Sequence, residues 1–324
     1  MPRRLLLLLS IAVLAPLRAD EPQVAGAESD VGQQELAPSG PPVRSMLELQ
    51  VELHRRAFSC GSIDGVWGAQ TESALRAFQR AGGIAESGLL DAPTQEKLRL
   101  TAPVLTDYTF TAVDMAGLKP IPGTWLEKSQ MTDLGFVSAI ELAGERFHAN
   151  PSLLRRLNPN VDWSKVMLGT SIKVPGVERV TVSGTPERVV ITLDARELDV
   201  VDSVSRVIAH FPVSIGRMVE KRPLGDLLVT VIIPDPNYTF DPAVFPESAE
   251  GKALGHNLTI PAGPNNPVGV TWIGLDRPGY GIHGTPEPEN VGRTESHGCF
   301  RLANWDVRTL AGLVHVGMTV NVEQ

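Results

Sequence analysis

The side chains best suited to chemistry lie near the C-terminal end of the chain, in two short segments. One segment holds His283, and the other holds His297 and Cys299. A thiol attacks a carbonyl carbon as the thiolate, so it needs a base, a group that orients the base, and donors for the developing oxyanion. The two segments contain candidates for all three, and their residue types therefore predict that Cys299 is a nucleophile.

Each requirement has a named candidate. We expect His283 to be the base, with a main-chain carbonyl near Gly284 holding its ring in the correct tautomer. Gly298 allows the backbone to approach a substrate closely, so the amides of Gly298 and Cys299 are expected to line an oxyanion hole. His297 is expected to support this loop or to replace His283 as the base.

These residues carry a resemblance to a known family. The segments around the thiol resemble the active-site motif of the L,D-transpeptidases, and the similarity covers about residues 180 to 323. The matching residues are His283-Gly284-Thr285, Ser296-His297-Gly298-Cys299-Phe300-Arg301, Asn304, Pro261 to Gly269 and Trp272 to Leu275. The resemblance implies that Cys299 is the nucleophile, His283 the base, His297 an active-site neighbour and Arg301 a residue that borders the substrate groove.

The resemblance also implies a substrate, the acidic peptide stems of peptidoglycan. Arg301 and Arg293 are therefore candidates for binding substrate carboxylates. Ser296, Asn304 and Tyr280 are further candidates for substrate contacts, because they lie in or beside the motif.

The implied reaction is acyl transfer without a cofactor. Cys299 would form a thioester with a tetrapeptide stem and pass it to an amine, giving a 3-3 cross-link or a protein attached to the wall. Three alternatives remain. The thioester could go to water, as in an L,D-carboxypeptidase or cross-link hydrolase; His283, His297 and Cys299 could bind zinc; or the chain could be a non-catalytic wall-binding adaptor built on residues 46 to 175.

The segment that positions these residues, 178 to 324, has the pattern of a mainly β domain. Short runs rich in Val and Ile, separated by Pro, Gly, Asp and Asn, predict a sandwich or barrel with one late helix and a final strand. The predicted strands are 189 to 193, 206 to 213, 227 to 233, 268 to 273 and 319 to 322, and the predicted helix is 305 to 314.

Two smaller units precede this domain, so the predicted fold class is multidomain α+β. Residues 46 to 100 predict three short helices, with Thr71 capping the second and Pro93 near the start of the third. This unit resembles the peptidoglycan-binding three-helix domain at Gln50, Ile63 to Gly68, Thr71, Ala74-Leu75, Phe78-Gln79 and Thr94.

Residues 105 to 176 predict a small α/β unit. Its expected elements are a strand at 108 to 111, a helix at 136 to 147, a helix begun by Pro151 and capped by Asn150, and a strand ending at Val174. This unit resembles a lysin motif, at Asn158 and Gly169 to Pro175, with an insertion around 118 to 132. The two units imply peptidoglycan glycan and stem peptides as partners.

The N-terminus and the composition agree with export to the cell envelope or periplasm. Arg3 and Arg4, an apolar run at 5 to 14, and Ala19 predict a signal peptide over residues 1 to 19, with no membrane span after its cleavage. Residues 20 to 45 predict a disordered tether. The formal net charge of -8 argues against a nucleic-acid partner, and two cysteines in different domains argue against a disulfide framework.

Overall fold

The computed structural model describes residues 40–177, 180–217, 222–243, 248–294 and 298–324. The predicted signal peptide and most of the predicted tether lie outside these ranges, and so do Ser296 and His297. Within the described ranges, no helix has both the length and the apolar character that a membrane crossing requires.

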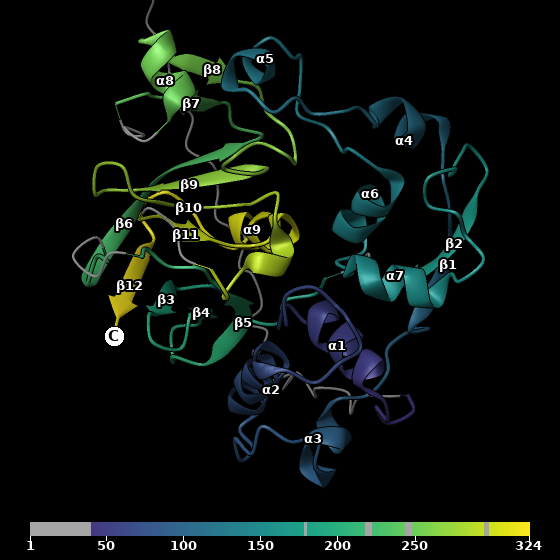
Figure 1. Ribbon diagram of the computed structural model, residues 1–324. Coiled ribbons are helices and arrows are strands. Elements are labelled where there is room, and N and C mark those ends of the chain that lie inside the picture. Colours follow the sequence, from purple (N-terminus) through teal and green to yellow (C-terminus); the bar gives the residue numbers. More distant parts are fainter. Residues whose placement is uncertain (1–39, 178–179, 218–221, 244–247, 295–297) are drawn as a thin grey trace, which may run out of the picture. The chain divides into compact units, whose positions relative to one another are not determined.

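The first unit consists of three helices, α1 (Met46–Arg55), α2 (Ala69–Ala81) and α3 (Ala92–Lys97) (Figure 1). Helix α1 begins with a capping box, because Ser45 accepts a hydrogen bond from the Glu48 amide and the Glu48 side chain accepts one from the Ser45 amide. Pro93 lies in the first turn of α3, as the sequence predicts.

Thr71 does not cap α2, and this prediction is wrong. The cap position is Gly68, and Thr71 lies buried inside the helix. Its hydroxyl accepts a hydrogen bond from Nε2 of Gln50 at 3.1 Å, and the same nitrogen donates to the Val66 carbonyl at 3.0 Å. Oε1 of Gln50 accepts from the Gly65 amide at 2.7 Å. Thr71 therefore helps to satisfy a buried amide that ties α1 to the following turn and to α2.

The predicted tether ends too late in the sequence. Val43 is fully buried in the core of the first unit. The Leu100 amide donates to the Pro41 carbonyl at 3.0 Å, and Pro42 forms a β-bridge with Arg99. Residues 41 to 43 therefore belong to the helical unit, because one apolar side chain and one backbone pairing fix them there.

The second unit is built on a two-stranded antiparallel sheet, β1 (Leu105–Thr109) with β2 (Ser171–Pro175). Between these strands lie α4 (Ala112–Gly117), α6 (Ala139–Arg146) and α7 (Pro151–Leu157). Asn150 caps α7 by accepting a hydrogen bond from the Ser152 amide, which confirms the predicted start of this helix. The core of the second unit contains Phe110, Phe147 and Leu154 at its centre.

Residues 118 to 134 leave this unit and pack against the third. They carry α5 (Trp125–Ser129), which lies beside β7 (Tyr238–Phe240), β8 (Leu258–Ile260) and α8 (Ala249–Leu254) (Figure 1). The Trp125 and Phe240 rings are stacked with centroids 4.5 Å apart. The Glu250 carboxylate accepts from the amides of Trp125 and Leu126 in the first turn of α5. The insertion is therefore joined to the small β7–β8 sheet and to α8 by both apolar and polar contacts.

The third unit contains one eight-stranded mixed sheet, in the order β11-β10-β9-β6-β12-β3-β4-β5. Its strands are β3 (Arg188–Thr192), β4 (Glu197–Val201), β5 (Val207–Pro212), β6 (Gly225–Pro234), β9 (Thr271–Leu275), β10 (Gly281–His283), β11 (Phe300–Arg301) and β12 (Thr319–Glu323). Helix α9 (Asn304–Ala311) and a short 3₁₀ helix, η2 (Pro288–Asn290), complete it.

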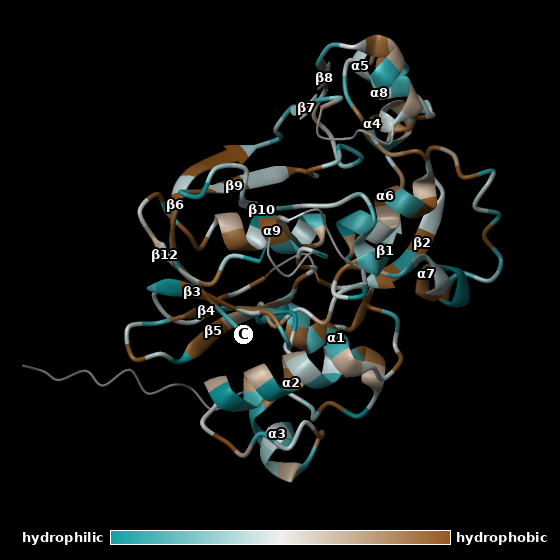
Figure 2. Ribbon diagram, turned by 60° about the vertical axis from the view of Figure 1, so that its left-hand side comes forward, coloured by the Kyte–Doolittle hydropathy of each residue, from teal (hydrophilic) through white to brown (hydrophobic). Residues whose placement is uncertain are grey.

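The apolar runs correctly predict β3, β5, β6, β9, β12 and α9, with ends shifted by a few residues. Strand β5 is buried along its whole length, and Figure 2 shows its apolar colouring. Side chains from β3 and β5 share one core cluster with Ile273, Ile282 and Phe300. The mainly β third unit and the multidomain α+β class are therefore confirmed.

The buried amide of Gln50 gives a stability prediction. Gln50→Leu removes the acceptor for the Gly65 amide and the donor to Thr71, so it should lower the free energy of unfolding of the first unit by about 1–3 kcal/mol. Urea unfolding of the full chain measures this change. Gln95→Leu, which loses only a 3.4 Å bond to the Val43 carbonyl, is the control. Equal stability of the two variants would contradict the structural role of Gln50.

Candidate active site

Three neighbouring strands position the candidate residues. Strand β10 pairs antiparallel with β9 and parallel with β11, and its register places His283 opposite both Trp272 and Arg301. Residues opposite each other in a sheet point to the same face, because side chains alternate along each strand. Trp272, His283 and Arg301 therefore share one face, while their neighbours Ile282 and Phe300 point into the core.

Cys299 immediately precedes β11, and its thiol lies within electrostatic range of Arg301 on that strand. The thiol is half-buried, and its Sγ lies 3.4 Å from the Gly279 carbonyl oxygen. The backbone is crowded beside it, because a Cβ added at Gly216 would lie 3.1 Å from the Gly298 Cα. The pairing of β10 with β11 thus brings the predicted nucleophile to the start of the strand beside the one that carries the predicted base.

The orientation of His283 is fixed by its own backbone turn. Its Nδ1 lies 2.7 Å from the Gly284 carbonyl oxygen. A carbonyl can only accept, so Nδ1 carries the hydrogen and Nε2 keeps a lone pair for accepting a proton. The carbonyl contact expected from the sequence is present, and it leaves the imidazole in the tautomer that a base requires.

Burial shifts both titratable groups toward their neutral forms. It lowers the pKa of His283 to about 4; the hydrogen bond to Gly284 opposes this shift, and the positive charge of Arg301 adds to it. Burial also raises the pKa of the Cys299 thiol, and a backbone hydrogen bond at Gly281 and the charge of Arg301 partly offset this. At neutral pH the thiol and imidazole are therefore both uncharged before substrate arrives.

Arg301 is held by backbone pairing on its outer side. Its amide donates to the Ser214 carbonyl and its carbonyl accepts from the Ser214 amide, each at 2.9 Å. The Arg301 guanidinium is half-buried and lies within electrostatic range of Cys299 and Glu287. This places a fixed positive charge beside the thiol, where it can attract a carboxylate.

The other residues predicted to contact the substrate include Tyr280, Arg293 and Ser296. Tyr280 is half-buried beside Gly298, and Arg277 lies over its ring at 4.6 Å from the centroid. Arg293 is exposed and lies near Glu289. Ser296 and His297 lie outside the described residues.

Asn304 has a supporting position in place of the expected substrate contact. It is fully buried, its Oδ1 accepts from the Val270 amide at 3.2 Å, and its Nδ2 donates to the Pro264 carbonyl at 3.1 Å. A Cβ added at Gly284 would lie 2.2 Å from the same Oδ1. Asn304 therefore fixes the 264–270 loop and the Gly284 turn, and so supports the carbonyl that orients His283.

Two aromatic residues near the site were not predicted from the sequence. Trp272 lies against His283 with ring centroids 5.7 Å apart. Tyr238 on β7 has its pKa raised by burial and by the negative charge that Cys299 carries as a thiolate. Trp272 lies in one of the segments that resemble the family motif, but it was given no role there; Tyr238 lies far from the motif in sequence, so only packing could identify it.

A cavity of about 180 Å³ lies between the second and third units and does not include the thiol. Ile140, Glu145 and Arg155 line one side, and Pro264 and Pro286 line the other. Burial raises the pKa of Glu145 to about 8. Neither Cys299 nor His283 lines this cavity, so it is separate from the candidate residues on β10 and beside β11.

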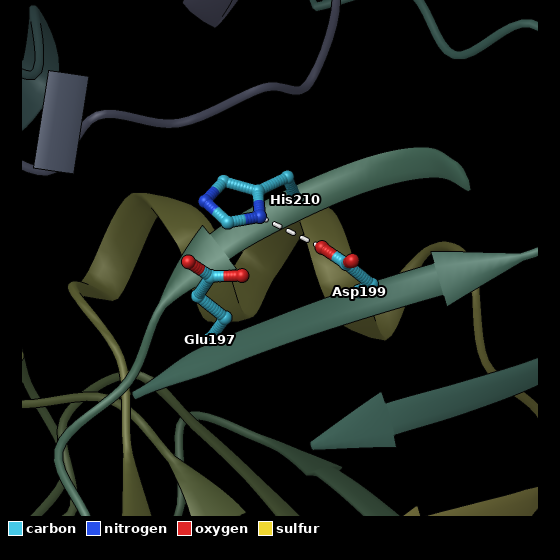
Figure 3. Close-up of side chains that lie close together, drawn as sticks. All are labelled: Glu197, Asp199 and His210. Carbon is cyan, nitrogen blue, oxygen red and sulfur yellow. Dashed lines mark hydrogen bonds and ion pairs between the residues drawn. The ribbon is translucent and has the colours of Figure 1, made fainter. Parts of the chain in front are cut away.

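One group of side chains in the described ranges is compact enough to suggest a metal site. Glu197, Asp199 and His210 have possible ligand atoms within 4.8 Å of one another (Figure 3). Asp199 Oδ1 lies 2.7 Å from His210 Nδ1, and the Ser73 hydroxyl lies 2.5 Å from Glu197 and 3.1 Å from His210 Nε2.

This group lies on β4 and β5, at the opposite end of the strand order from β10 and β11. Arg80 of α2 also pairs with Asp199 at 2.9 Å. Because α2 side chains already satisfy the group, we assign it to the contact between the first unit and the sheet.

Comparison with known proteins places the chain among cell-wall enzymes. The L,D-transpeptidase catalytic domain family matches residues 186–322, and the peptidoglycan-binding domain family matches residues 44–98. A crystal structure of an L,D-transpeptidase from Xylanimonas cellulosilytica aligns with 87% of this chain and 95% of that chain, at 17% identity and a TM-score of 0.36.

Two Bacillus relatives give the sequence comparison. A Bacillus licheniformis protein that carries the name L,D-transpeptidase YkuD is 26% identical over 183 residues, covering 56% of this chain and 92% of the relative. A Bacillus subtilis protein named as the L,D-transpeptidase YqjB is 32% identical over 152 residues, covering 45% of this chain and 72% of the relative. The match to the catalytic domain and the coverage of these relatives show that the chain belongs to the L,D-transpeptidase family.

Proposed function

We propose that this chain is an exported envelope enzyme that cross-links peptidoglycan through a thioester on Cys299. The observation that carries the proposal is the arrangement of two paired strands: a half-buried thiol immediately precedes β11, the parallel partner of the strand that carries His283, and the Nδ1 of His283 is held by the Gly284 carbonyl. The first unit belongs to a peptidoglycan-binding family and supports the same polymer as partner.

The first half of the reaction is acylation. The Cys299 sulfur attacks the carbonyl carbon that joins the L-centre of the third stem residue to the terminal D-residue, while Nε2 of His283 takes the thiol proton. Amides of Gly298 and Cys299 stabilise the oxyanion. The C–N bond then breaks, His283 returns the proton to the leaving amine, and the thioester remains.

The second half is transfer. An amine of the acceptor attacks the thioester carbonyl, His283 accepts its proton, and the C–S bond breaks to restore the thiol. Arg301 attracts a stem carboxylate during both halves. The acceptor is a second stem, giving a 3-3 cross-link, or a protein that becomes attached to the wall.

The closest alternative gives the same thioester to water, as an L,D-carboxypeptidase or cross-link hydrolase. Transfer is favoured because burial of His283 and Cys299 limits the access of water to the thioester. Product analysis with and without an added amine acceptor separates the two outcomes.

The uncharged state of His283 and Cys299 at neutral pH leads to a prediction about the pH dependence of acylation. His283 must be unprotonated to accept the thiol proton, so thioester formation should hold its rate down to about pH 5 and fall as the pH drops through the His283 pKa of about 4. Stopped assays of acylation across pH 3 to 8 measure the profile. A fall centred near the ordinary histidine pKa of about 6.5 would contradict the buried neutral base.

The base assignment gives a mutational prediction. His283→Gln should leave a folded protein in which thioester formation falls about 100-fold or more, the scale of losing a general base. His297→Gln should reduce the rate less. The reverse order would show that His297 is the base.

The nucleophile assignment gives a third prediction. Incubated with a disaccharide tetrapeptide, the protein should release one D-amino acid and show an intact-mass adduct on the peptide that contains Cys299. Cys299→Ala should lose the adduct, whereas Cys60→Ala should keep it, because Cys60 is buried and burial raises its thiol pKa strongly. Turnover that survives in Cys299→Ala would exclude this mechanism, and an unchanged cellular phenotype with intact wall binding would favour the adaptor alternative.

A further inference from the structure

Trp272 packs directly against the proposed base. The two residues are opposite each other on neighbouring antiparallel strands, so their side chains leave the same face of the sheet. Their ring centroids are 5.7 Å apart and their planes differ by 23°, a stacked geometry. Trp272 is half-buried, whereas His283 is almost fully buried. The indole therefore covers the imidazole on the side away from β11.

The indole lies on a floor made of two glycines. Gly274 and Gly281 are opposite each other in the same strand pair. A Cβ added at Gly281 would lie 2.5 Å from Cζ2 of Trp272, and a Cβ added at Gly274 would lie 3.1 Å from its Nε1. The contact at Gly281 would require the ring to move, and the one at Gly274 would require it to shift by a few tenths of an ångström. The absence of side chains at both positions is thus what allows the indole to lie flat on this floor.

One of these glycines, Gly281, also lies close to the thiol in the strand pairing. Continuing the parallel register of β10 and β11 by one residue pairs Gly281 with Cys299, and a hydrogen bond at the Gly281 backbone affects the thiol. The groups that face His283 in the described part of the chain are the Gly284 carbonyl, the charge of Arg301, with Glu287 near it, and Trp272. The carbonyl fixes one nitrogen, but a single hydrogen bond leaves the ring free to rock about it.

We propose that Trp272 is a positioning residue for His283: the indole, seated on Gly274 and Gly281, holds the plane of the imidazole and keeps water from that side of the ring. The inference rests on the proposed function, because it assigns to Trp272 an effect exerted through the base. It also gives the glycines at 274 and 281 a role in catalysis, which is to leave room for the indole.

The test compares four variants of the full chain, and a fifth as the control, in the acylation assay. Trp272→Ala and Trp272→Leu both remove the aromatic plane, and the leucine variant keeps apolar bulk so that folding is preserved. Trp272→Phe restores a flat ring. Gly281→Ala displaces the native indole, although its Cβ would also lie 2.9 Å from the Ile273 carbonyl oxygen, so the Trp272 variants decide the test. Gly123→Ala, where an added Cβ meets nothing within 4 Å, is the matched glycine control.

We expect the alanine, leucine and Gly281→Ala variants to lose about 10- to 100-fold in kcat for acylation, the scale of a small misplacement of a reacting group. Water would reach the imidazole, so the acid limb of the pH profile should move from about 4 toward the ordinary histidine value of about 6.5. Trp272→Phe should recover most of the rate and the native limb, and Gly123→Ala should match the native protein.

Two results separate this inference from the proposed function. If Cys299→Ala and His283→Gln lose acylation while Trp272→Leu keeps the native rate and pH limb, the positioning role is wrong and the mechanism stands. If Trp272→Phe is as slow as Trp272→Leu, the aromatic plane is not what matters, and the inference also fails. If His283→Gln itself keeps the native rate, the proposed base is wrong, and the role of Trp272 fails with it.

Discussion

The register of β10 between β9 and β11 is the constraint on which the site depends. His283, Trp272 and Arg301 share a face only because their strands are aligned residue by residue, with Ile282 opposite Ile273 and Phe300 on the core side. A slip by one residue would turn His283 into the core and bring Ile282 to the surface. Burial of Ile282, Ile273 and Phe300 therefore fixes the strand register, and with it which side chains lie on the opposite face. Exposing even one of the three would cost about 1.5–3 kcal/mol.

Contacts around His283 then set its tautomer and its charge. The Gly284 carbonyl accepts a hydrogen bond from Nδ1 of His283 and so fixes the imidazole tautomer. The side-chain amide of Asn304 occupies the space that a side chain at Gly284 would need. Burial then keeps both the imidazole and the thiol uncharged at rest. An uncharged pair avoids the desolvation cost of a buried ion pair, and it delays charge separation until a carbonyl is present to share the developing charge.

The sequence predicted the parts of this arrangement that are local. The proposed nucleophile, the proposed base and the Gly284 carbonyl lie within short motifs, and the apolar runs located most central strands. Strand β4 was missed because Glu197 and Asp199 interrupt its apolar pattern, and both acidic side chains are held by partners on α2 and β5. Asn304 was expected at the substrate because motif membership does not distinguish a contact from a support. The contact of Trp272 with His283, and the place of Tyr238 near the thiol, were visible only in the packing.

The insertion in the second unit changes where the catalytic part of the chain begins. Leu134, Phe240, Leu258 and Ile260 form one buried cluster, and Trp125 packs against it. This cluster is a small core assembled from residues that the sequence assigns to two different domains. A fragment cut at residue 178, where the pattern of strands begins, would leave Phe240 and Ile260 without their cover and would loosen the two-stranded β7–β8 sheet that carries Tyr238. The smallest fragment of the third unit that can fold alone therefore has to include the α5 segment, which the sequence assigns to the second unit. An evolutionary exchange of wall-binding modules in this protein would have to keep the α5 segment with the third unit.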